Sequence, residues 1–161
     1  MFKALDVAYY TIAYSNIICR KSVSNSQLNK LLYCIQKAHL KRYDAPFFVE
    51  DIAVYGFGPA IPNVWLEFCY YGGKSIPIDY RYATMQEKVT TFSIKDKDFI
   101  DEIVDRYIDI GNYKWFKLFK EDNLNTIWGQ MYNQGKGLFD IIPLEFIKEE
   151  QEFVFDEQER A

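Results

Sequence analysis

The chain is poor in residues that bind metals or form disulfides. It has one histidine, His39, and three cysteines, Cys19, Cys34 and Cys69. The cysteines are widely spaced and odd in number, and no Cys-x-x-Cys pair occurs, which argues against a disulfide framework or a zinc site. No second histidine exists for a histidine-rich metal site. We therefore expect no metal and no cofactor, and reduced thiols of the kind found in cytosolic proteins.

Positive charge and long apolar runs are also scarce. The chain has 19 Lys and Arg against 23 Asp and Glu, for a net charge of −4. Nucleic acids are bound mainly through Lys and Arg that neutralise phosphates, so a dedicated nucleic-acid partner is not expected. No apolar run approaches the length of a membrane span, and the N-terminus lacks the regions of a signal peptide. These absences predict a cytoplasmic protein without membrane contact.

Aromatic residues, by contrast, are abundant. The chain has 13 Tyr, 13 Phe and 3 Trp, which together make up 18% of its residues. This exceeds what one core of this size needs, so some of these side chains are expected on the surface. Exposed Tyr and Trp are common anchors of protein interfaces. The alternative is that Tyr simply replaces Leu in the protein of an AT-rich genome, and composition alone leaves both open.

The chain is expected to form one domain at residues 1–150, followed by an acidic tail at 151–161 that frays. Apolar periodicity and capping residues predict helices at 3–19, 25–43, 63–70, 93–109 and 142–148, with shorter helical segments at 113–119 and 125–132. Strands are expected at 52–55, 76–78 and 89–92, with a rigid Gly-Pro loop at 56–62. The fold class is mainly α (α+β), a compact helical domain with a small β-hairpin or short sheet.

The helix near residues 25–43 separates its side chains into two groups. It begins at Ser24, Asn25 or Ser26, with the last two favoured as caps. The 3.6-residue period groups a buried stripe made of Leu28, Leu31, Leu32, Ile35 and His39. Lys30 and Tyr33 lie off that stripe. They either bind the adjoining strand or Gly-Pro loop of the same chain or face a partner, and the pattern does not separate these readings.

No residue set has a clear catalytic pattern. A nucleophilic or acid–base site would have to use His39, whose position on the apolar stripe favours a satisfied core histidine. A hydrolase centred on His39 with Glu50 or Asp51 is the rival hypothesis. The segment Gly56-Phe57-Gly58-Pro59 lacks the Gly-Lys-Ser/Thr of a phosphate loop and is better interpreted as a turn. We therefore expect no catalytic residues and no enzymatic activity.

Several motifs together resemble a known family, the Panacea domain, also described as phage-associated proteins of the GepA type. The resemblance rests on Leu28-x-Lys30-Leu31-Leu32-Tyr33, His39-Leu40, Pro46-x-Phe48 and Ile52-Ala53-x-Tyr55-x-x-Gly58-Pro59-x-Ile61-Pro62. It continues more weakly through Ile103-Val104, Trp128 and Ile142-Pro143-x-Glu145-x-Ile147. The chain departs from the family pattern at Asn29, at Ile52-Ala53-Val54-Tyr55, and near Leu124-Asn125, where the usual Thr-His is absent.

The resemblance implies an antitoxin that neutralises a cognate toxin protein by direct binding. It also implies a second activity, because one family member delivers its toxin to a cellular protease as an adaptor. The rival interpretation is a phage-associated regulator or inhibitor of a host protein, and homo-oligomerisation stays open. The residues expected to bind the partner are Lys30, Tyr33, Tyr55, Phe57, Gly58, Pro59 and Trp65.

Overall fold

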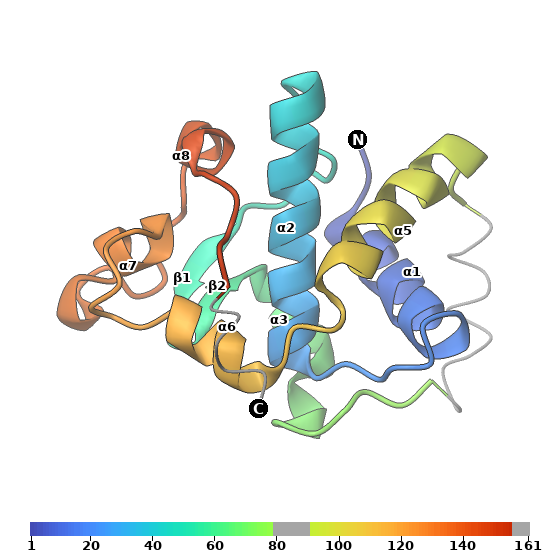
Figure 1. Ribbon diagram of the computed structural model, residues 1–161, viewed down its shortest axis with the longest axis horizontal. Helices are drawn as coiled ribbons and strands as arrows, with labels where there is room; N and C mark the ends of the chain where they lie inside the picture. Colours follow the sequence, from blue (N-terminus) through green and yellow to red (C-terminus); the bar gives the residue numbers. More distant parts are fainter. Residues whose placement is uncertain (79–90, 156–161) are drawn as a thin grey trace.

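The computed structural model describes residues 1–78 and 91–155, and its elements pack around one central helix, α2 (Asn25–Tyr43) (Figure 1). Helices α1 (Ala4–Ile17) and α5 (Ile94–Tyr107) cover one side of α2, and a β-hairpin and α8 cover the other. The remaining elements are β1 (Ala53–Tyr55), β2 (Gly58–Ala60), α3 (Pro62–Phe68), the 3-10 helix η1 (Cys69–Tyr71), α6 (Asn112–Leu118), α7 (Ile127–Tyr132), η2 (Asn133–Gly135) and α8 (Leu144–Glu149). The expected mainly helical class with a small hairpin is confirmed.

Helix α2 begins and ends where neighbouring residues satisfy its free backbone groups. Ser24 accepts a hydrogen bond from the Gln27 amide, and the Gln27 side chain accepts one from the Ser24 amide. This reciprocal capping box makes Ser24 the N-cap, one residue before Asn25 and two before Ser26, which were the favoured caps. At the other end Asp44 adopts a left-handed conformation, and its amide bonds the carbonyl of Leu40. The predicted end near Tyr43 is confirmed.

The predicted buried stripe of α2 is correct except at its last member. Its four aliphatic members are at most 2% exposed: Leu28, Leu31, Leu32 and Ile35. His39 is only half-buried, because the last turns of α2 reach the margin of the core. Its Nδ1 lies within hydrogen-bonding distance of the Ala45 carbonyl oxygen, and its ring packs against Phe47 and Phe99. His39 is therefore a satisfied histidine, but it is not a core residue.

The segment expected to be a Gly-Pro loop forms the second strand of the hairpin. β1 and β2 pair antiparallel, with Ala53 opposite Ala60 and Tyr55 opposite Gly58, so that Gly56 and Phe57 make a two-residue turn. The loop prediction was wrong from Gly58 onward, because a tight turn let the chain pair with β1. The other edge of β1 bonds the segment after η2, through Val54 and the backbone of residues 139 and 140. Strand β1 is thus bonded along both of its edges.

Two other expectations need correction. The tail does not fray at 151–155, because Phe153 and Phe155 pack against the core; residues 156–161 lie outside the described part. Residues 76–78 form no strand, although Ser75 pairs with Ser24 in an isolated bridge. The strand expected at 89–92 falls partly outside the described residues.

Within 1–78 and 91–155, no helix has the length and apolar character needed to cross a membrane.

Candidate functional site

Four aromatic rings form a connected surface beside the hairpin, here called the hairpin aromatic surface: Tyr55, Phe57, Trp65 and Phe139. The Trp65 ring packs edge-on to Tyr55, with centroids 5.7 Å apart, and parallel to Phe57 at 6.3 Å. Phe139 meets the other side of Tyr55 at 5.3 Å. Phe57 is 68% exposed and Phe139 is 64% exposed. A connected, solvent-exposed apolar patch of this kind is typical of a protein-interaction site.

Short-range structure holds these rings in place. The two-residue turn carries Phe57 at the tip of the hairpin, and Pro62 starts α3 so that Trp65 falls in its first turn, beside the tip. The indole nitrogen of Trp128 donates to the carbonyl of Tyr55 at 2.8 Å, which fixes the end of β1 against α7. The surface therefore sits on rigid elements, which lowers the entropic cost of binding a partner.

Gly58 and Pro59, both expected to contact the partner, are buried beneath this surface. Gly58 has φ +131°, and a Cβ there would lie 3.2 Å from the Phe119 ring and 3.4 Å from Cε of Lys30. Only glycine adopts this backbone conformation readily, and only glycine leaves room for Phe119 and the lysine stem. Gly58 therefore supports the hairpin by its conformation and its small size.

Replacing Gly58 with alanine is expected to lower the free energy of unfolding by roughly 1–3 kcal/mol, the usual cost of a strained backbone position. Gly56→Ala is the matched control in the same turn, because its φ is not in the left-handed range and a Cβ there would meet nothing within 4 Å. Urea denaturation of both variants measures the difference. Equal stability of the two variants would show that the Gly58 conformation is not required.

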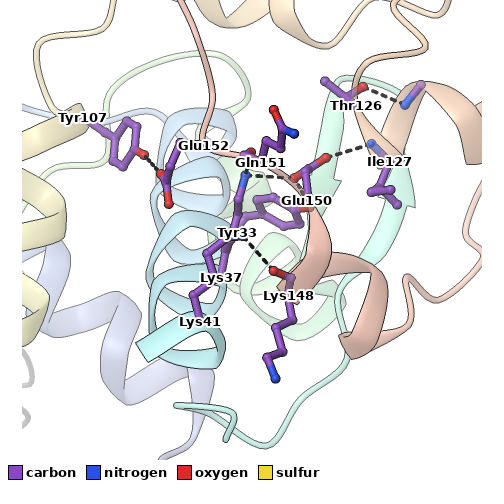
Figure 2. A network of polar contacts seen from close by, with 11 residues as sticks. Tyr33, Lys37, Lys41, Tyr107, Thr126, Ile127, Lys148, Glu150, Gln151 and Glu152 are labelled. Atoms are coloured by element: carbon purple, nitrogen blue, oxygen red, sulfur yellow. Dashed lines mark hydrogen bonds and ion pairs between the residues drawn. The ribbon is translucent and has the colours of Figure 1, made fainter. Parts of the chain in front are cut away.

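Tyr33 lies in the core and not off it, which corrects its expected position. It is 1% exposed, and its hydroxyl donates to Oε1 of Glu150 at 2.6 Å (Figure 2). Tyr33 could have contacted either its own chain or a partner protein. The structure shows that it contacts its own chain. The acceptor lies beyond α8 and not in the adjoining strand or loop. Burial, followed by the Glu150 carboxylate, raises the pKa of Tyr33 well above its ordinary value, so the hydroxyl stays protonated as a donor.

Glu150 is the centre of a buried polar network that sequence reasoning missed (Figure 2). Its carboxylate also accepts from Lys37 Nζ at 3.2 Å and from the Ile127 amide at 2.7 Å. Lys37 donates further to the Gln151 carbonyl, and its Nζ lies 3.7 Å from the centroid of the Phe153 ring. Burial lowers the pKa of Lys37, and the Glu150 carboxylate opposes that shift. The network fastens α7 and the C-terminal segment to α2.

Lys30 is also more buried than expected, at 5% exposed. Its Nζ donates to Oγ of Ser26 and lies 5.9 Å from the centroid of the Phe119 ring. It lines a pocket of about 270 Å³ together with Phe57 and rings from α6. This pocket, here called the Lys30 pocket, therefore opens beside the hairpin aromatic surface and shares Phe57 with it.

The residues of the rival hydrolase hypothesis are not brought together. Glu50 accepts a hydrogen bond from the Ala4 amide at 2.7 Å, and Asp51 is exposed. A hollow of about 130 Å³ does lie beside His39, but its lining includes neither carboxylate; the acidic residue there is Asp96. In the described ranges, no group of three or more His, Cys, Asp or Glu side chains is placed to hold a metal ion.

The protein is thus a mainly helical domain that displays the hairpin aromatic surface on its β-hairpin and neighbouring segments. A family model described as "Antitoxin SocA-like, Panacea domain" matches residues 28–154, which is most of the chain. The protein therefore belongs to the SocA-like antitoxin family of Panacea domains, and the suspected resemblance is confirmed. No curated protein and no solved structure matches the chain. The matched range begins inside α2 and includes the hairpin, the aromatic surface and Glu150.

Proposed function

We propose that this protein is a cytoplasmic antitoxin that neutralises a cognate toxin by direct binding and has no catalytic activity of its own. The observation that carries the proposal is the hairpin aromatic surface, with Phe57 and Phe139 more than 60% exposed on a rigid support. Interfaces are enriched in aromatic anchors, and a few such residues usually supply most of the binding free energy. Membership in an antitoxin-like family supports a toxin as the protein that binds this surface.

Two of the expected partner-binding residues act indirectly in this proposal. Tyr55, Phe57 and Trp65 would contact the toxin. Tyr33 holds the C-terminal segment on α2 through Glu150, and Gly58 allows the hairpin to approach Phe119. The roles of these two are therefore to keep the scaffold and the surface in position. The proposal extends to delivery of the bound toxin to a cellular protease, which would use a second surface while the hairpin holds the toxin.

Co-expression with the product of the directly adjacent gene tests the proposal. We expect that product to stop growth when expressed alone, this protein to restore growth, and the two to copurify. The half-life of the toxin in the same cells tests the adaptor role, because delivery to a protease shortens it and simple sequestration does not. A neighbour that is harmless alone, or equally toxic in both cases, would contradict the antitoxin role and leave a regulator of a host protein as the better function.

A further inference from the structure

Lys30 carries a buried charge that the described part of the protein does not balance. The only hydrogen bond of its Nζ there goes to the Ser26 hydroxyl, and no acidic side chain of the described residues contacts it. An ammonium has three donors, so two find no acceptor in these residues. Lys37, by contrast, is equally buried on the same helix and is paired with Glu150. Burial of a charge without a counterion is costly, and a ligand that supplies the counterion removes that cost.

The pocket around this charge is small and combines four aromatic rings with polar side chains. Lys30 shares it with residues of the helix start, the hairpin tip and α6: Ser26, Phe57, Asn112, Trp115, Phe116 and Phe119. Phe116 is 62% exposed and Phe57 is 68% exposed, whereas Trp115 and Phe119 are buried. The rings therefore form a rim that is open to solvent and a closed base. Among the described residues that line it, Lys30 is the only one with a titratable side chain.

We propose that the Lys30 pocket receives a side-chain carboxylate, from an aspartate or glutamate of the partner protein, which pairs with Lys30 Nζ. The Ser26 hydroxyl accepts from Lys30, so its own hydrogen is free to donate to the same carboxylate. The exposed Asn112 amide offers a further donor at the pocket. The inference rests on the proposed function, because the bound partner supplies the acidic residue.

The lining favours a single carboxylate over a nucleic-acid phosphate. Binding to a phosphate backbone relies on several Lys or Arg side chains, and this pocket has one cation among four rings. A side chain also carries its carboxylate two or three bonds from the main chain. It can therefore pass the Phe57 and Phe116 rim while the partner's backbone remains on the hairpin aromatic surface.

The pairing has a defined pH dependence. Burial lowers the pKa of Lys30 from 10.5 to about 8. The pairing requires the charged ammonium and an ionised carboxylate, so at neutral pH and above the affinity falls as the pH rises through about 8 and Lys30 loses its proton. A bound carboxylate favours the charged form, so the pKa in the complex lies above that of the free protein. The other described residues that line the pocket have no titratable side chain and do not contribute to this profile.

Nuclear magnetic resonance titration of the full chain with small blocked amino acids tests the proposal. The probes are N-acetyl-glutamate N-methylamide, its glutamine counterpart, and N-acetyl-alanine, which carries a free C-terminal carboxylate. We expect the glutamate probe to shift the Lys30 side-chain resonances with at least tenfold higher affinity than the other two. Lys30→Met keeps the apolar stem and should abolish this preference. Lys3→Met, at an exposed position, is the control and should preserve it.

Equal binding of the glutamate and glutamine probes, or no binding of either, would overturn the proposal. Preference for N-acetyl-alanine would overturn the assignment to a side chain. The complex with the adjacent gene product separates this inference from the proposed function. If Lys30→Met binds that product as tightly as wild type, the inference fails while the antitoxin role stands. If wild type does not neutralise it, the antitoxin role fails whatever the probes show.

Discussion

Replacing Glu150 with alanine is expected to lower the free energy of unfolding by about 3–5 kcal/mol, the cost of breaking a buried ion pair by removing one partner. The carboxylate is nearly inaccessible, and it accepts from the Tyr33 hydroxyl, the Lys37 ammonium and the Ile127 amide. Its loss leaves these three donors without their acceptor in the core. Urea denaturation at neutral pH measures the change.

Two further variants separate the network from a general effect of charge. Glu149→Ala removes the neighbouring exposed carboxylate and should change the free energy of unfolding by no more than about 0.5 kcal/mol. The double variant Lys37→Met/Glu150→Met removes both charges and should recover the part of the loss that comes from the unpaired ammonium, because apolar side chains can replace a buried ion pair at little cost. The part that comes from the Tyr33 hydroxyl and the Ile127 amide should remain. A cost for Glu150→Ala as small as that for Glu149→Ala would contradict the network's role in stability.

Replacing Phe57 and Trp65 together with serine is expected to weaken partner binding about 100-fold or more, equivalent to about 3 kcal/mol. The two rings stack on each other at the hairpin tip, so the double change removes the centre of the hairpin aromatic surface. The fold should persist, because Phe57 is exposed and Trp65 is only partly buried. Calorimetric titration with the purified partner measures the dissociation constant.

Ile94→Ser is the matched control for this loss of affinity. Ile94 is 79% exposed and begins α5, on the side of α2 opposite the hairpin (Figure 1). Removing an exposed apolar side chain there should leave the dissociation constant unchanged. Equal weakening by Ile94→Ser and by the double variant would indicate that the partner is held by general surface hydrophobicity and not at the hairpin.

Local features of the fold could be predicted because they depend on neighbouring residues. The end of α2 follows from Asp44-Ala45-Pro46, and the start of α5 follows from Ser93, whose side chain accepts from the Asp96 amide. What covers α2 could not be predicted, because that depends on contacts between distant segments. Tyr33 and Glu150 are separated by 117 positions. The amphipathic pattern therefore suggested one buried stripe, whereas the C-terminal segment buries a second face.

Some residues of the candidate site could also be predicted from the sequence, and others could not. Tyr55, Phe57 and Trp65 could be singled out from their expected off-core or loop placement and from the family resemblance. Phe139 could not, because only the pairing of its segment with β1 brings it to Tyr55. Lys37 did offer a signal: it lies four residues after Tyr33, so the two share a helix face. A shared face predicts a common environment, and here that environment contains Glu150.

In the proposed function, this chain neutralises a toxin through the hairpin aromatic surface. The most direct test is the growth of cells that express the adjacent gene product with the wild-type protein or with the Phe57→Ser/Trp65→Ser variant, at matched levels of folded protein. We expect wild type to restore growth and the double variant not to restore it. Equal rescue by both proteins would contradict this role of the surface.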